Sequence, residues 1–210
     1  MKNMFFCPFI IGLAVYAAEA PFLTEPPAIL VWEEHNGFGS NFEKTLIVAV
    51  WNNGDMLWST NTVSGGKPYL YNKVNASNDV HKLLASFQAK GYLSPEFSKL
   101  IVGPEASCTR IVISSGTNVL NTGSWHEIFE RNQNLVALST GIRALKKGES
   151  REAALKKDKA EYLQYRAMWT DIRSQINIIL PEKGSPIEDV EIRRQIGNIP
   201  AVTILREQNE

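Results

Sequence analysis

Two side chains near the middle of the chain, Cys108 and His126, could take part in nucleophilic catalysis. A cysteine attacks as its thiolate, and a neighbouring base raises the thiolate fraction by accepting the proton. Residues 109–115 alternate and are rich in β-branched types, and Gly116-Thr117-Asn118 is typical of a turn, so a hairpin is expected. With this loop Cys108 lies opposite His126. No flanking residues match a thiol-protease motif, and a semi-buried structural role is the favoured explanation of Cys108.

A metal site is a second hypothesis for the same region. His126-Glu127-Ile128-Phe129-Glu130 begins like the helix of a zinc protease, in which two histidines four residues apart hold the metal. Glu130 stands where that motif has its second histidine. His126 and Glu130 could supply two ligands from one helix face, and His35 or His81 could supply the third that catalytic zinc needs. The simpler expectation is that the chain holds no metal and no cofactor.

A capping box gives these residues a structural explanation. Ser124-Trp125-His126-Glu127 has the Ser-x-x-Glu form, which predicts a helix that begins at Ser124 and runs towards Arg131. The second strand of the hairpin would then end before its register reaches His126. Glu127 is needed at the helix start in this interpretation, which weakens both the thiol and the metal hypotheses.

Tryptophans are the candidate binding residues, because an indole ring can stack on a flat or ring-shaped ligand. Asn53-Gly54 between two apolar stretches predicts a hairpin with a two-residue turn. That turn pairs position 49 with 58 and 51 with 56, which places Trp51 and Trp58 on one face. We expect this face to be core, and a carbohydrate-binding platform is the alternative. Trp125, inside the capping box, is the third candidate.

Further elements follow from the spacing of apolar residues. Strands are expected over 29–32 and 45–51, with a polar loop between them, and a turn over 64–68. A helix that starts at Ser77 or Asn78 is expected to bury Val80, Leu83, Leu84 and Phe87 and to end before Gly91. Helical patterns also cover 133–147 and 150–180, the latter as one helix or as two joined near Asp158. We expect the buried stripe of the last helix to hold Tyr162, Tyr165, Trp169, Ile172, Ile176 and Ile179, and lysine-rich 156–159 to be a solvated face.

This order of elements predicts an α+β fold. We expect a single domain over 29–181, in which an antiparallel sheet of hairpins is packed by helices on one face, with a long helix in the C-terminal half. Residues 18–28 contain three prolines and are expected to form an extended leader. Residues 182–210 are expected to form a polar C-terminal tail, partly mobile, with a short strand over 202–205.

The first 17 residues have the features of a bacterial signal peptide. Lys2 precedes an apolar run over 5–14, and small residues favour a cut after Ala17. The run is too short to span a membrane, so no stable membrane insertion is expected after cleavage. The mature protein is therefore expected to be exported, to the periplasm or the cell exterior. Cleavage also removes Cys7, which leaves Cys108 as the one thiol and allows no internal disulfide.

The charge balance bears on partners. The chain has 22 basic and 22 acidic residues, and binding to nucleic acid needs a clear positive excess, so no nucleic-acid partner is expected. The sequence loosely resembles uncharacterised exported bacterial proteins that combine three features. They are a Trp-x-x-Gly-x-x-x-Trp-Ser hairpin, here 51–59, a Ser-Trp-His-Glu segment, here 124–127, and an aromatic helix, here with Tyr162, Tyr165 and Trp169. The resemblance implies a single domain and no particular activity.

Two hypotheses for function remain. The leading one is a non-enzymatic binding or structural domain of the cell envelope or exterior, whose partner is a protein or a glycan. The alternative is a small exported hydrolase, in one version metal-assisted, that uses His126 with Glu130 or Cys108.

Overall fold

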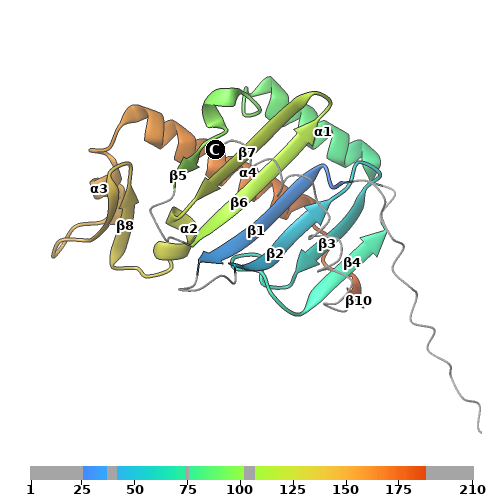
Figure 1. Ribbon diagram of the computed structural model, residues 1–210, viewed down its shortest axis with the longest axis horizontal. Helices are drawn as coiled ribbons and strands as arrows, with labels where there is room; N and C mark the ends of the chain where they lie inside the picture. Colours follow the sequence, from blue (N-terminus) through green and yellow to red (C-terminus); the bar gives the residue numbers. More distant parts are fainter. Residues whose placement is uncertain (1–25, 37–41, 74–75, 102–106, 188–210) are drawn as a thin grey trace, which may run out of the picture.

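The computed structural model describes residues 26–36, 42–73, 76–101 and 107–187. The predicted signal peptide over 1–17 and the predicted strand over 202–205 lie outside these residues. Within them, the chain has an α+β fold made of one large mixed sheet, a few helices and a small hairpin at one side (Figure 1).

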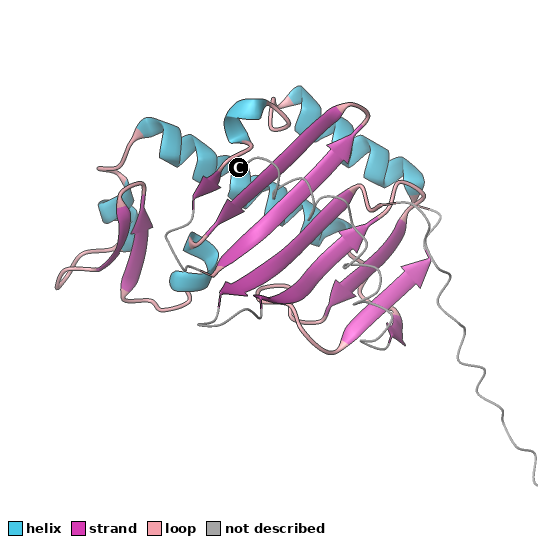
Figure 2. Ribbon diagram, in the orientation of Figure 1, coloured by secondary structure: helices cyan, strands magenta, loops and turns pink. Residues whose placement is uncertain are grey.

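The described residues place eight strands in the large sheet, in the order β10-β4-β3-β2-β1-β6-β7-β5. Their bounds are β1 Ile29–Asn36, β2 Phe42–Val50, β3 Asp55–Ser59, β4 Tyr69–Lys73, β5 Leu100–Ile101, β6 Cys108–Ser115, β7 Asn118–Ser124 and β10 Ser185–Ile187. Neighbouring strands are antiparallel except β5 and β7, which run parallel, so the sheet is mixed where an antiparallel one was expected. β10 comes from the segment expected to be tail and pairs with β4 at the edge (Figure 2).

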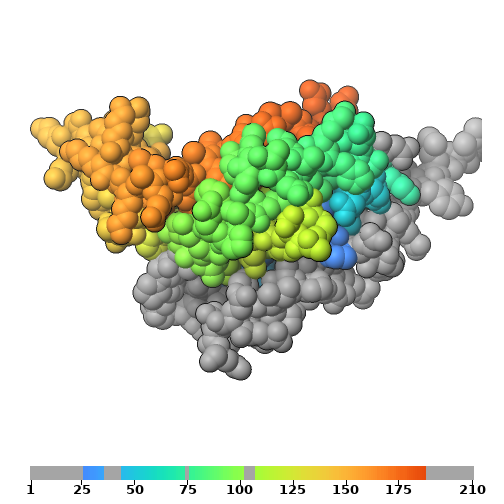
Figure 3. Space-filling view, turned by 90° about the horizontal axis from the view of Figure 1, so that it is seen from above, coloured from blue at the N-terminus to red at the C-terminus, as the bar shows by residue number. Residues whose placement is uncertain are grey.

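Two long helices, α1 Ser77–Ala89 and α4 Ala160–Ile179, pack against the sheet. The shorter helices are α2 His126–Phe129, α3 Arg151–Leu155 and the 3-10 turn η1 Pro95–Phe97. In the space-filling view α4 (orange) lies beside α1 (teal to green), and the part that holds α3 extends to one side (Figure 3). Of the two alternatives left open for residues 150–180, one helix or two joined near Asp158, the structure has the second, because α3 and α4 flank that residue. Among the described residues, no helix is both long enough and apolar enough to cross a membrane.

The main core lies between the sheet and these two helices. The four predicted apolar positions of α1 are buried there, and so is the predicted stripe of α4 from Tyr162 to Ile176. On β1, Ile29 and Val31 join this core, whereas Leu30 and Trp32 belong to a second apolar cluster. Because side chains alternate along a strand, the second cluster lies on the opposite face of the sheet.

The first hairpin differs from the prediction by one residue in register. Val48 pairs with Trp58 and Val50 with Met56, around a three-residue loop in which Gly54 has a φ of 92° and its N–H donates to the Trp51 carbonyl. A glycine in the left-handed region closes such a loop, whereas a two-residue turn was assumed. A shift of one residue reverses the face of a side chain. Trp51 and Trp58 therefore lie on opposite faces, 5% and 4% exposed, and the prediction of one shared face is wrong.

The helix predicted over 133–147 is wrong, because this segment forms a hairpin. Strands β8 Leu135–Leu138 and β9 Gly141–Ala144 pair as a separate two-stranded sheet. Gly141 has a φ of 138°, a conformation outside the helical region. The turn residues between the two strands space their apolar side chains three and four apart, which imitates a helical stripe.

Candidate functional site

Cys108 lies at the start of β6 and is buried. Its Sγ is 3.8 Å from Glu34 Oε2, the oxygen that also accepts a hydrogen bond from Arg110 Nε at 2.9 Å. Burial, opposed by Arg110 and reinforced by the Glu34 carboxylate, raises the pKa of the thiol to about 12. At neutral pH the side chain is an unreactive thiol.

The expected juxtaposition of Cys108 with His126 does not form. The hairpin turns through the two residues Gly116 and Thr117, so Thr109 pairs with Ser124. Ser124 Oγ lies 2.6 Å from His126 Nδ1, so the imidazole is held on the same face of the sheet as the Thr109 side chain. Cys108 shares the opposite face with Arg110, because side chains alternate along β6. The loop expected to have three residues has two, and this difference separates the pair.

His126 is 5% exposed and begins the single-turn helix α2. Its ring lies edge-on to Trp169 of α4, with 5.3 Å between the ring centroids. Burial, together with the Arg166 guanidinium and against the opposing effect of Glu127 and Glu130, lowers the pKa of His126 to about 4, so the imidazole is neutral at pH 7. Strand β7 continues through Ser124, and the helix ends at Phe129 instead of running to Arg131. The capping box does not form, since Glu127 instead accepts a hydrogen bond from Arg173 at 3.0 Å.

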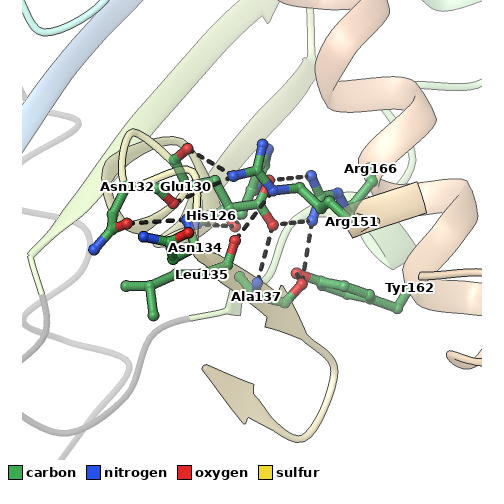
Figure 4. Close-up of polar contacts among 10 residues, drawn as sticks. His126, Glu130, Asn132, Asn134, Leu135, Ala137, Arg151, Tyr162 and Arg166 are labelled. Carbon is green, nitrogen blue, oxygen red and sulfur yellow. Dashed lines mark hydrogen bonds and ion pairs between the residues drawn. The ribbon is translucent and has the colours of Figure 1, made fainter. Parts of the chain in front are cut away.

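Glu130 is bound by arginine on both carboxylate oxygens (Figure 4). Arg166 Nη1 and Nη2 donate to Oε1 and Oε2, each at 2.7 Å, and Arg151 Nε lies 3.6 Å from Oε2. Oε1 also accepts the N–H of Ala137 at 2.9 Å. Burial raises the pKa of Glu130, but the hydrogen bonds from Arg166 and Ala137 outweigh this effect, and the net pKa is lowered. The carboxylate is therefore ionised and fully engaged.

The other proposed metal ligands are not near Glu130 in a common cluster. His81 is exposed on α1, and His35 Nε2 lies 3.1 Å from Glu33 Oε2. Within the part of the chain that the structure describes, no three His, Cys, Asp or Glu side chains are grouped so that they could hold a metal ion. Cys108, His126 and Glu130 each have structural partners instead.

The Glu130 pair belongs to a network that holds the β8–β9 hairpin against α4. Tyr162 Oη and Arg166 Nη1 donate to the Ala137 carbonyl at 3.0 and 3.1 Å (Figure 4). Arg151 donates to the carbonyls of Glu130, Asn132 and Leu135. At the hairpin turn, the N–H of Ser139 donates to Asp158 at 2.8 Å. The turn of the hairpin and the first turn of α4 are thus fixed to one another.

A pocket of about 370 Å³ opens where this hairpin turn, the start of α4 and β5 meet. Its apolar and aromatic lining consists of Leu100, Ile101, Trp125 and Tyr162. Its polar and charged lining consists of Lys99, Ser139, Lys159 and Glu161. The two kinds of side chain contribute equally in number, so the pocket suits a ligand with both apolar and polar surface.

Trp125 is the sequence candidate that this pocket contains. Its backbone N–H donates to the Ile101 carbonyl at 3.2 Å, and its ring packs edge-on against Phe129 with centroids 6.5 Å apart. The indole N–H is buried and has no hydrogen-bond partner among the described residues. Trp51 and Trp58 lie in the two cores and do not reach the pocket.

Sequence reasoning missed the other pocket residues. Lys99 carries no motif, Tyr162 was expected only as part of the buried stripe of the last helix, and Lys159 belongs to a stretch expected to be only a solvated face. Only the fold brings these residues together, and β5 and the β8–β9 hairpin, which help to form the pocket, were not predicted. Comparisons with models of protein families, with curated proteins and with solved structures found no match.

Proposed function

We propose that this chain is a single-domain, non-enzymatic binding protein, exported to the bacterial periplasm or the cell exterior, whose pocket beside Trp125 binds one sugar unit of a glycan. The proposal of export rests on the sequence of residues 1–17. The proposal of binding rests on the mixed pocket at the one tryptophan candidate that is not in a core.

The composition of the pocket favours a sugar over an apolar peptide side chain. A sugar ring presents C–H groups on its face and hydroxyl groups around its rim. The aromatic side chains of Trp125 and Tyr162 suit the first, and the hydrogen-bonding groups of Ser139, Lys159 and Glu161 suit the second. The volume of about 370 Å³ lies within the range of roughly 300–1,000 Å³ that is usual for small-ligand sites.

The states of the three candidate catalytic side chains support binding over hydrolysis. The Cys108 thiol has a pKa of about 12, the His126 imidazole is buried against Trp169, and both oxygens of Glu130 accept from Arg166. A nucleophile or base must reach the substrate, and none of the three lines the pocket. The small exported hydrolase therefore remains the less favoured alternative.

Isothermal titration calorimetry tests this function. We expect the purified protein to bind at least one methyl hexoside with millimolar affinity, and Trp125→Ala to weaken it at least about tenfold because the stacking surface is lost. Lys157→Ala, an exposed change outside the pocket, should leave the affinity unchanged. Circular dichroism of each variant checks that it is folded.

Absence of binding across the common hexosides would overturn the proposal. Cleavage of a glycoside that disappears in His126→Ala, or stoichiometric zinc in the purified protein, would favour the hydrolase instead.

A further inference from the structure

The charged side chains that line the pocket are unbalanced. Lys99 and Lys159 contribute two ammonium groups, and Glu161 contributes one carboxylate. All three residues are exposed, and none of them forms an ion pair with the residues that the structure describes. The pocket therefore offers a net positive charge to a ligand.

The nearby Asp158 carboxylate attracts Lys159 electrostatically and so offsets part of this excess, but its hydrogen bonds go to the backbone and the hairpin turn and not to the Lys159 ammonium. One oxygen accepts the N–H of Ser139 at 2.8 Å, and the other accepts the N–H of Lys159 at 2.8 Å together with the Ser139 hydroxyl. Asp158 is not among the residues that line the pocket. The side-chain ammonium of Lys159 stays available to a ligand.

The positions of the two lysines strengthen the effect. Lys159 immediately precedes α4, a helix of 20 residues whose N-terminal end carries partial positive charge. Lys99 Nζ lies 5.7 Å from the centroid of the Tyr165 ring, a cation–π contact that limits the movement of the ammonium group. A preorganised cation loses less conformational entropy when it binds an anion.

We infer that the sugar bound in this pocket carries a carboxylate, as in a uronic acid, and that Lys99 and Lys159 recognise it. This inference rests on the proposed glycan-binding function. A neutral sugar uses the aromatic wall and the hydroxyl contacts only. A uronate adds charge-assisted hydrogen bonds from the two ammonium groups, which are stronger than neutral ones.

The test compares two ligands that differ at one carbon, methyl β-D-glucuronide and methyl β-D-glucoside. We expect calorimetry at low ionic strength to show about tenfold tighter binding of the glucuronide. Lys99→Gln and Lys159→Gln should each reduce this preference to about threefold, and the double variant should abolish it. Lys157→Gln, the matched exposed control, should keep the full preference. Added salt should shrink the preference in the unchanged protein, because it screens the lysines.

The outcomes separate this inference from the function on which it rests. Equal affinity for the two glycosides would overturn the acidic preference while leaving glycan binding intact. Failure of both glycosides to bind would overturn both proposals. Tighter binding of tri-alanine, which presents a free carboxylate on a peptide, would show that the pocket reads a peptide terminus and would also overturn the uronate inference.

Discussion

At the residue scale, the burial of His126 links the fold to pH. The pKa of the imidazole is 6.5 in the unfolded chain and about 4 in the folded one. Below pH 6.5 the unfolded state therefore binds more protons, and the free energy of unfolding falls as the pH drops towards 4. We predict that His126→Gln removes about 3 kcal/mol of this fall, measured by urea unfolding at pH 7 and pH 4.

The difference between His126→Gln and the unchanged protein separates the contribution of His126 from that of the carboxylates, which titrate in the same pH range in both proteins. His81→Gln alters an exposed histidine on α1 and should follow the unchanged protein at both pH values. If the free energy of unfolding fell equally between pH 7 and pH 4 for His126→Gln and the unchanged protein, the neutral, buried state of His126 would be contradicted.

Cys108 provides a second prediction at this scale. Because its pKa is about 12, the thiolate fraction at pH 8 is smaller than in an unfolded chain by about a thousandfold. In a Cys7→Ser variant, which leaves Cys108 as the thiol measured, we expect a disulfide reagent to label the native protein very slowly. Labelling in guanidinium chloride should be rapid. Fast labelling of the native protein would revive a nucleophilic role for Cys108.

At the element scale, Glu130 connects α2, the β8–β9 hairpin and α4. Replacement by glutamine keeps one oxygen that can accept the Ala137 N–H, but it removes the negative charge and the second acceptor oxygen that Arg166 and Arg151 use. We predict that Glu130→Gln lowers the free energy of unfolding by about 2–4 kcal/mol, as removal of one partner from a largely buried ion pair does. Urea unfolding at pH 7 measures this change.

The matched control is Glu152→Gln, which breaks an exposed ion pair with Lys156 one turn along α3. A surface pair of this kind contributes under about 0.5 kcal/mol. If the two variants were equally stable, the Glu130 network would not hold the hairpin in place.

Residues 135–144 form a hairpin although a helix was predicted, and the same network explains the difference. Apolar side chains at 135, 138, 142 and 145 have helical spacing, and local propensity cannot distinguish this from two short strands around a turn. The distinction comes from distant residues, since Arg166 and Tyr162 of α4 bind the Ala137 carbonyl and Glu130 binds its N–H. By contrast, the stripes of α1 and α4 were predicted because their burial follows from their own spacing.

At the scale of the whole molecule, prediction reached the α+β composition, most of the central strands and both long helices. It failed where a one-residue difference in loop length decided the outcome, as for Trp51 and Trp58 and for Cys108 with His126. It also failed for the pocket, because its lining residues are spread between positions 99 and 162 and come from β5, Trp125, the β8–β9 turn and the start of α4. Only Trp125 was a candidate in advance, and the fold supplies its neighbours.

The most direct test of the central claim uses fluorine NMR of protein labelled with 5-fluorotryptophan. The chain has five tryptophans, and Trp32, Trp51, Trp58 and Trp169 are at most 5% exposed, so Trp125 is the reporter of the pocket. Trp125→Phe identifies its resonance. On titration with methyl β-D-glucuronide, we predict that the Trp125 resonance moves and saturates while the other four stay in place. An unmoved Trp125 resonance, or movement of Trp51 or Trp58 instead, would contradict a sugar-binding pocket beside Trp125.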